Sequence, residues 1–305
     1  MHSLSSVSVI VPVRNGEKTI ETLIEALVVQ DYPKDHTEII IVDNGSRDRT
    51  IEIIKKYSVM LAEENSMHSS YAARNTGLSL ARGEIIAFTD ADCIPELNWI
   101  SAGVRALNEE NADLAGGRIH FIFSARESAA EYFDSIQFLD NEKYVKNKRG
   151  AATANLFVRA NVFKQIGLFP NVQSGGDMLL TGKALENGFS LIYAPQAIVR
   201  HPTRNLTEIL KKYWRITSIS SHVEEDSVQN RPPSNKSGYG YFRKLFILMR
   251  LLIPIPSKRF FSLLIANLGN PKIKNRFFAL WGIAYLCQLM QFMALVYYFF
   301  QKGKK

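Results

Sequence analysis

The chain has few cysteines and no long apolar segment near its start, and these two absences limit which class of protein it can be. Cys93 and Cys287 are its 2 cysteines, far apart in sequence, so no disulfide framework is predicted. Residues 1–6 are polar, and the apolar run that follows, residues 7–13, has only the length of a strand. A secretory signal is therefore not expected. We expect the first part of the chain to lie in the reducing cytoplasm.

Acidic residues are outnumbered, which gives a formal net charge of +8 and allows nucleic acid, an anionic membrane or an acidic substrate as partner. The basic residues gather toward the C-terminus and alternate there with apolar runs; they include Lys211, Lys212, Arg215, Arg243, Lys244, Lys258, Arg259, Lys272, Lys274, Arg276 and Lys302. Such alternation favours a membrane surface over nucleic acid.

The C-terminal part predicts membrane association. Residues 277–300 carry no charged side chain, and about 20 apolar residues suffice to span a bilayer, although a buried helix of a soluble core is the alternative. Residues 241–255 are expected to lie in the interface as an amphipathic helix. Residues 224–240 are polar and contain Pro and Gly, which predicts a linker or mobile loop between a domain at 1–223 and a membrane-associated region at 241–305.

Strands and helices alternate in the first part of the chain, which predicts an α/β fold with a parallel sheet and right-handed crossovers. The expected strands are residues 7–13, 38–42, 59–63 and 85–88, and the expected helices are 18–30, 48–57 and 69–81. The strict alternation of strands and helices then ends, and strands are expected at 114–123, 155–159 and 191–199 and helices at 125–138 and 178–186. We expect this second half to hold a different ligand.

Two carboxylates one residue apart, Asp90 and Asp92, follow directly after the expected strand at 85–88. Such a pair can hold Mg²⁺ or Mn²⁺ and leave coordination positions for diphosphate oxygens. Asp-X-Asp triplets are also common in solvated turns, so the triplet alone is weak. Two earlier strands end in the same way, however, and ligands of open α/β sheets collect at the carboxyl ends of the strands. The sequence therefore predicts a cation site that serves transfer from an activated phosphate donor.

Four segments in order carry a family resemblance: VSVIVPVRNGEKTI, IIIVDNGSRDRT, YAARNTGLSLARGEIIAFTDADC and GGDMLLTGKALENGFSLIYAPQAIVRH. Together they resemble the family 2 glycosyltransferases over residues 7–201. The resemblance implies the GT-A nucleotide-diphospho-sugar transferase fold, a Rossmann-like mixed sheet flanked by helices, here followed by C-terminal membrane-associated helices.

The resemblance implies roles for residues near the nucleotide and the metal. The nucleotide-binding positions are Pro12, Arg14, Asn15, Asp43, Arg74 and Asp90, with Asp48 near the same pocket. A buried salt bridge is the alternative for Arg74, and a helix cap for Asp48. In the metal motif Asp92 ligates the cation, and Asp90 meets the ribose or a metal-bound water. His201 completes the metal site in some relatives, although a single histidine can equally be structural.

The resemblance also implies a catalytic base, Asp177, because an inverting transfer requires the acceptor hydroxyl to lose its proton as it attacks. The alternative for Asp177 is the N-cap of the helix at 178–186. Many relatives have Glu-Asp where this chain has Gly176-Asp177, which puts the acceptor contacts in doubt. Donor sugar or acceptor is expected near Asn155 and Gly176, with residues 150–155 and Arg159 framing the site. Arg215 matches a diphosphate contact of some membrane-bound relatives; interfacial anchoring by Tyr213 and Trp214 is the alternative.

The expected function is a metal-dependent, inverting hexosyltransferase that moves a sugar from a nucleotide donor, a UDP-sugar, to a hydroxyl of a saccharide or lipid-linked acceptor. Surface polysaccharide or glycolipid synthesis at the cell membrane is expected, with the catalytic domain facing the cytoplasm and no nucleic acid involved. Alternatives are a polyprenyl-phosphate sugar synthase and, of another class, a non-catalytic membrane-bound sensor or scaffold for sugar nucleotides. A processive polymer synthase would need several spanning helices.

Overall fold

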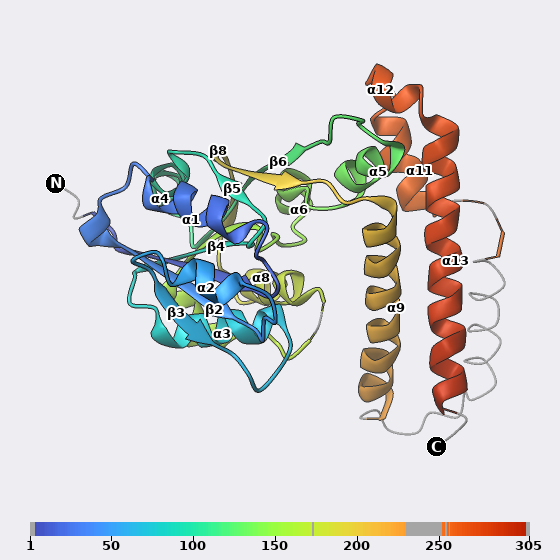
Figure 1. The fold of residues 1–305 in the computed structure, drawn as a ribbon. Coiled ribbons are helices and arrows are strands. Elements are labelled where there is room, and N and C mark those ends of the chain that lie inside the picture. The colour runs from blue at the N-terminus through green and yellow to red at the C-terminus, as the bar shows by residue number, and fades with distance from the viewer. Residues whose placement is uncertain (1–3, 173, 230–251, 254, 256, 303–305) are drawn as a thin grey trace. The chain divides into compact units, whose positions relative to one another are not determined.

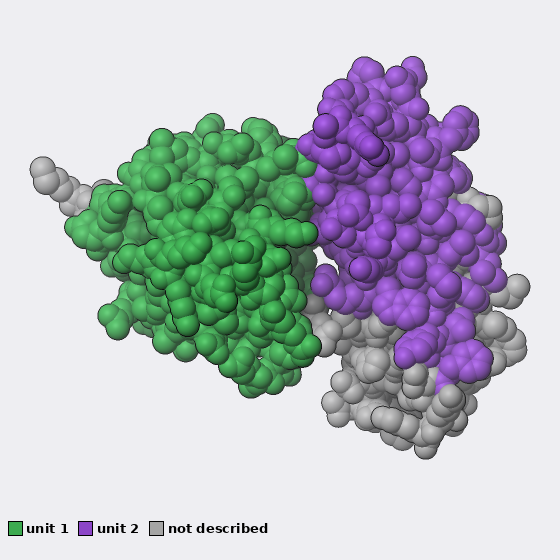
Figure 2. Space-filling view, viewed as in Figure 1, with its two compact units in different colours: residues 1–122, 139–202 green, residues 123–138, 203–305 purple. Residues whose placement is uncertain are grey.

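The computed structural model describes residues 4–172, 174–229, 252–253, 255 and 257–302. The chain forms two compact units, which Figure 2 colours separately. Unit 1 comprises residues 1–122 and 139–202, and unit 2 comprises residues 123–138 and 203–305. The expected boundary after residue 223 does not coincide with this division, because the chain enters unit 2 first at residue 123 and finally at residue 203.

Unit 1 is built on one eight-stranded sheet (Figure 1). Its strands are β1 (Val7–Val13), β2 (Thr37–Asp43), β3 (Met60–Glu63), β4 (Ile85–Thr89), β5 (Ile94–Pro95), β6 (Leu114–Ile122), β7 (Asn155–Arg159) and β8 (Leu191–Pro202). The order is β3-β2-β1-β4-β7-β6-β8-β5. The first four strands are parallel, as predicted, whereas β7 runs antiparallel to both β4 and β6. The sheet is therefore mixed.

The helices of unit 1 are α1 (Ile20–Val28), the 3-10 helix η1 (Lys34–His36), α2 (Thr50–Ile54), α3 (Ser70–Leu80), α4 (Trp99–Glu109), α6 (Asn141–Lys146), α7 (Ala160–Ile166) and α8 (Gly176–Glu186). Side chains alternate between the two faces of the central strands. Val9 and Val11 of β1 belong to a core that includes α1 and α4, whereas Ile10 belongs to a core that includes α7 and α8. Burial of each such side chain contributes roughly 1.5–3 kcal/mol.

Parallel pairing brings the predicted strand ends to one edge of the sheet. Ile10 of β1 pairs with Ile40 of β2 on one side and with Phe88 of β4 on the other. Asp43 closes β2 and Asp90 follows β4, so both carboxylates lie at the carboxyl edge. This is the edge where open α/β sheets bind ligands.

Unit 2 is helical. Its helices are α5 (Ala129–Gln137), α9 (Leu206–Gln229), α11 (Lys258–Ala266), α12 (Pro271–Lys274) and α13 (Phe277–Lys302). α9 and α13 pack side by side (Figure 1). Because α9 continues to Gln229, residues 224–229 are helical and not part of a loop; the rest of the expected linker and most of the expected interfacial helix, residues 230–251, lie outside the described residues.

α13 contains the one helix segment, among the described residues, that is long and apolar enough to cross a membrane: Phe277–Tyr297. Only 28% of that candidate span is buried inside the structure, whereas the core helix of a soluble protein is mostly buried. Phe278 and Phe300 are 87% and 72% exposed. Length, composition and exposure are thus consistent with membrane association.

Candidate active site

The candidate active site lies in unit 1 and contains predicted residues from five elements. Asp43 ends β2, Asp90 and Asp92 follow β4, Arg74 lies on α3, Asp177 lies in the first turn of α8, and His201 lies near the end of β8. The structure joins them in three pairs: Arg74 with Asp90, Asp92 with His201, and Asp177 with Tyr71. Tyr71 is a residue that the sequence analysis did not single out.

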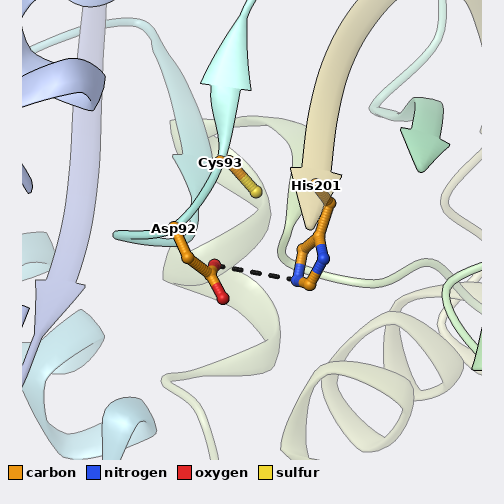
Figure 3. Close-up of side chains that lie close together, drawn as sticks. All are labelled: Asp92, Cys93 and His201. Carbon is orange, nitrogen blue, oxygen red and sulfur yellow. Dashed lines mark ion pairs between the residues drawn. The ribbon is translucent and has the colours of Figure 1, made fainter. Parts of the chain in front are cut away.

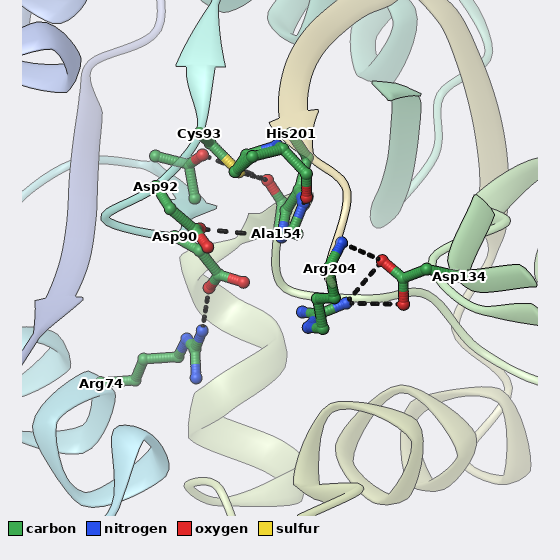
Figure 4. Close-up of polar contacts among 10 residues, drawn as sticks. Arg74, Asp90, Asp92, Cys93, Asp134, Ala154, His201 and Arg204 are labelled. Carbon is green, nitrogen blue, oxygen red and sulfur yellow. Dashed lines mark hydrogen bonds and ion pairs between the residues drawn. The ribbon is translucent and has the colours of Figure 1, made fainter. Parts of the chain in front are cut away.

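Arg74 and Asp90 form an ion pair in which Nη2 lies 2.5 Å from Oδ1 (Figure 4). The arginine is 3% exposed, and its Nε is buried without a hydrogen-bond partner in the described structure. The predicted alternative for Arg74, a buried salt bridge, is therefore present. It occupies one oxygen of Asp90 and balances part of the negative charge of the carboxylate pair.

Asp92 and His201 form a second pair, shown in Figure 3, in which Oδ1 lies 3.7 Å from Nε2. Nδ1 of His201 lies 2.6 Å from the carbonyl oxygen of Pro202. Because a carbonyl can only accept, Nδ1 carries the proton in this contact, and when the ring is neutral Nε2 presents its lone pair. Nε2 is buried and has no hydrogen-bond partner in the described part of the chain. A histidine whose other nitrogen donates to a backbone carbonyl is typical of metal ligation.

Cys93 is the third possible ligand in this cluster, since one ligand atom from each of Asp92, Cys93 and His201 lies within 4.8 Å of the others. Its Sγ donates to the carbonyl oxygen of Ala154 at 3.8 Å, and burial raises the pKa of the thiol well above its usual value. Sulfur is also a ligand that suits soft metals and not hard cations such as Mg²⁺ and Mn²⁺. The donor set that remains, a carboxylate and an imidazole, fits Mn²⁺ or Mg²⁺.

Asp43 presents an unused acceptor at the end of β2. The residue is 2% exposed, and its Oδ2 accepts hydrogen bonds from the backbone N–H groups of Gly45 and Ser46 at 3.0 and 2.9 Å. Gly45 permits this turn because its φ is +78°. Oδ1 is buried with no partner among the described residues. An orphaned buried acceptor is costly unless a ligand donates to it, which fits the predicted nucleotide role.

The residues predicted around Asp43 shape the loops at this edge. Pro12 is buried in β1 and Arg14 is exposed beyond it. Asn15 links the first two strand-end loops, because its Oδ1 accepts from the backbone N–H of Arg47 at 2.9 Å. Asp48 accepts from the backbone N–H groups of Glu17 and Thr50, but the N-cap of α2 is Arg49, so the helix-cap alternative for Asp48 is wrong. Nucleotide contacts of Pro12, Arg14 and Asn15 remain predictions.

Asp177 is not the N-cap of its helix, as its alternative role proposed. The capping residue is Gly175, whose φ of +76° is left-handed, and α8 already begins at Gly176. Oδ1 of Asp177 accepts from the backbone N–H of Met178 at 3.0 Å and from the Tyr71 hydroxyl at 3.2 Å. Burial raises the pKa of the Asp177 carboxyl above its usual value, and the positive charge of Arg74 opposes that shift. A raised pKa suits a general base.

Two predicted sugar-site side chains serve the fold. Asn155 is fully buried; its Oδ1 accepts from the Trp99 indole at 2.9 Å, and its amide donates to two carbonyls at 2.8 Å. Arg159 donates to the carbonyls of Ala112 and Leu107. Because these groups are already paired, the structure argues against the expected sugar contacts of both side chains.

The remaining prediction concerns unit 2. Arg215 is exposed on α9, and its diphosphate contact remains a prediction. Tyr213 packs in the core of unit 2, where Gln137 donates to its hydroxyl at 3.3 Å and its ring lies 5.9 Å from that of Phe138. Interfacial anchoring by Tyr213, the alternative considered for this segment, does not agree with that packing.

Strand-end carboxylates, an orphaned acceptor and a carboxylate–imidazole pair at the carboxyl edge of a mixed α/β sheet are the features of a ligand-binding site of an α/β protein. Residues 8–167 match the model of glycosyl transferase family 2. A glycosyltransferase of Haloferax volcanii, AglE, is 39% identical over 220 residues, covering 70% of this chain and 72% of the relative. The chain belongs to the family 2 glycosyltransferases, as its sequence resemblance predicted.

Solved structures confirm the GT-A fold. The mannosyltransferase PcManGT from Pyrobaculum calidifontis, in complex with GDP-Man and Mn²⁺, has a TM-score of 0.63 at 18% identity and covers 99% of this chain and 89% of that chain. Residues 1–349 of TarS from Staphylococcus aureus, in complex with UDP-GlcNAc, give 0.53 at 23% identity, over 70% of this chain and 65% of that chain. These similarities concern the fold.

Proposed function

We propose that the protein is an inverting, cation-dependent glycosyltransferase that moves a sugar from a nucleoside diphosphate to a hydroxyl acceptor at a membrane. The acceptor is a saccharide or a lipid-linked sugar of a surface glycan. The observation that carries the proposal is the Asp92–His201 pair, in which a buried imidazole nitrogen without a partner lies 3.7 Å from a carboxylate oxygen. Two such donors fit one divalent cation.

Nucleotide binding would use the acceptors at the carboxyl edge of the sheet. Oδ1 of Asp43 accepts an N–H from the base, which relieves the cost of its burial without a partner. Asp90, whose Oδ1 is held by Arg74, has its second oxygen for a ribose hydroxyl. Both uracil and guanine offer a suitable ring N–H, and the relatives' structures contain UDP-GlcNAc and GDP-Man. We favour a UDP-sugar, in keeping with the sequence resemblance.

Negative charge develops on the diphosphate as it leaves the sugar. Asp92 and His201 would hold the cation, Mn²⁺ or Mg²⁺, and a bound divalent cation supplies positive charge that neutralises the leaving diphosphate. Asp177 accepts the proton of the acceptor hydroxyl. As that proton leaves, the acceptor oxygen forms a bond to the anomeric carbon, the bond from that carbon to the diphosphate breaks, and its electron pair stays on the diphosphate oxygen.

Membrane association would come from unit 2. The exposed apolar side chains of α13, together with the basic residues at both of its ends, support binding to an anionic lipid surface. Catalysis on cytosolic nucleotide sugars would place unit 1 on the cytoplasmic face of the membrane.

The proposal is tested by incubating the purified full chain with UDP-glucose, UDP-GlcNAc and GDP-mannose and measuring released UDP or GDP with and without Mn²⁺. We expect cation-dependent release from one donor, and loss of that release in Asp92→Ala. A wild-type protein that neither turns over nor binds any of these donors would refute the proposal.

A further inference from the structure

Tyr71 connects the catalytic-base candidate to the nucleotide side of the site. It lies on α3, is 7% exposed, and its hydroxyl donates to Oδ1 of Asp177 at 3.2 Å. The guanidinium carbon of Arg74, one turn later on α3, lies 5.4 Å from the centre of the tyrosine ring. Phe169 also stacks on the tyrosine ring, with the two ring centroids 5.6 Å apart and an interplanar angle of 27°. The ring is thus held by packing, with little freedom to move its hydroxyl.

Gly176 makes room for this ring. A Cβ atom added at Gly176 would lie 2.9–3.0 Å from three carbon atoms of the Tyr71 ring, a separation at which one of the two must move. The absence of a side chain at Gly176 therefore lets the Tyr71 hydroxyl reach Asp177, the next residue along the chain. A glutamate at position 176, expected from the resemblance, would carry a Cβ into the same contact with the ring.

The two oxygens of Asp177 are not equivalent. Oδ1 accepts from the Tyr71 hydroxyl and from the backbone N–H of Met178, at 3.2 and 3.0 Å. For Oδ2 the described residues provide no hydrogen-bond partner. Two donors on one oxygen fix the rotation of the carboxylate and leave the other oxygen with its lone pairs free.

We propose that Tyr71 is a positioning residue for the transfer reaction: it orients Asp177 so that Oδ2 takes the acceptor's proton, and Gly176 is the glycine that this contact requires. The inference rests on the proposed role of Asp177 as the base. Tyr71 itself exchanges no proton with substrate, and its hydroxyl acts only through the carboxylate that it holds.

The first test is Tyr71→Phe, which removes one hydroxyl and retains the ring packing. With the preferred donor and Mn²⁺, we expect kcat for nucleotide release to fall about 10- to 100-fold, as for a lost hydrogen bond to a charged group, with the donor KM unchanged. Tyr57→Phe is the matched control, because the Tyr57 hydroxyl also lies near carboxylates, those of Glu21 and Glu25 at 3.4 Å, away from the site. Its kcat should equal that of the wild type.

The second readout is the pH profile, which a purely structural role would not move. Arg74, Tyr71 and Asp90 are the charged or titratable groups that act on the Asp177 carboxyl. The Tyr71 hydroxyl favours the ionised carboxylate and so lowers its pKa. Loss of that hydroxyl in Tyr71→Phe is expected to shift the acid limb of kcat/KM to higher pH.

The third test uses Gly176→Ala, whose Cβ should displace the ring. We expect the same loss of kcat as in Tyr71→Phe, and the double variant should lose no more than the single ones, because the hydrogen bond can be broken only once. Gly182→Ala is the control on the same helix, where an added Cβ meets nothing within 4 Å.

The outcomes separate this inference from the function on which it rests. If Asp177→Asn abolishes transfer while Tyr71→Phe keeps the wild-type kcat and pH profile, the positioning role is overturned and the proposed function stands. If Asp177→Asn retains the wild-type kcat, the base assignment and the positioning role both fail.

Discussion

The imidazole Nε2 of His201 faces Oδ1 of Asp92 across 3.7 Å, a distance too long for a hydrogen bond between them. The histidine is 1% exposed, so water does not readily satisfy its free nitrogen. Its Nδ1 is held by the Pro202 carbonyl, which orients the ring toward the aspartate. A buried acceptor held in this way beside a carboxylate is the pair of groups that would hold the proposed cation.

We predict that His201→Ala weakens Mn²⁺ binding in the presence of UDP by at least about 10-fold, the lower bound for losing a partner of a metal site, since it removes one of the two side chains that would hold the cation. Isothermal titration calorimetry measures this directly. His36→Ala is a matched control, because His36 lies 3.9 Å from Asp35 in a pair that is well exposed. Equal Mn²⁺ affinity in His201→Ala and wild type would contradict ligation by the histidine.

Asp177→Asn tests both the proposed catalytic base and the effect of burial on the pKa of this carboxyl. Loss of general-base assistance should lower kcat by about 10²- to 10⁴-fold while UDP affinity stays unchanged. Burial raises the pKa of Asp177 in the folded state, so ionisation of this group costs stability above its unfolded pKa. The Asn variant should therefore melt at a higher temperature than the wild type at neutral pH, and this advantage should shrink as the pH falls below the folded pKa.

The control for that experiment is Asp35→Asn, at a carboxylate that is 81% exposed. Neither its kcat nor its melting temperature should differ from the wild type. Full transfer activity in Asp177→Asn would eliminate the base role, and a lower melting temperature would contradict the argument from burial.

Arg74→Ala is expected to weaken UDP binding and to destabilise unit 1. The arginine side chain is 4% exposed and that of Asp90 is 31% exposed, so the unpaired aspartate regains part of its hydration. We expect a loss of roughly 2 kcal/mol in the free energy of unfolding, below the usual cost of breaking a fully buried pair. Urea denaturation and UDP titration give the two quantities. Arg49 pairs with Glu17 at 3.6 Å, and its side chain is 76% exposed. Arg49→Ala should therefore change neither the free energy of unfolding nor the UDP affinity measurably.

The exposed apolar side chains of α13 predict how the protein reaches membranes. Phe278→Glu combined with Phe300→Glu should reduce flotation with anionic vesicles by several-fold and preserve the fold, because both side chains are exposed. Leu168→Glu alters an apolar side chain of unit 1 that is 55% exposed and should leave flotation unchanged. If the double variant floats as well as the wild type, α13 is not the membrane-binding element.

Local patterns in the sequence determined the elements of unit 1 and the edge at which its site lies. Short β-branched runs alternate with segments whose apolar residues recur at helical spacing, which predicts an α/β fold. Neighbouring side chains of a strand point to opposite faces of the sheet. The strands β1, β2 and β4 and the carboxylates at their ends were therefore predictable. The family motifs added Asp177 and His201, because those positions occur in quoted segments.

Only the tertiary structure decided which of these groups meet and which serve the fold. Tyr71 and Asp177 are 106 residues apart, and their hydrogen bond depends on the space that Gly176 leaves between α3 and α8. Asn155 matched a sugar-site motif, but packing of three elements around it used all of its hydrogen-bonding groups. Hydrophobic periodicity and composition predict the structure of a few neighbouring residues. Contacts such as these depend on how whole helices and strands pack, which a local sequence pattern does not specify.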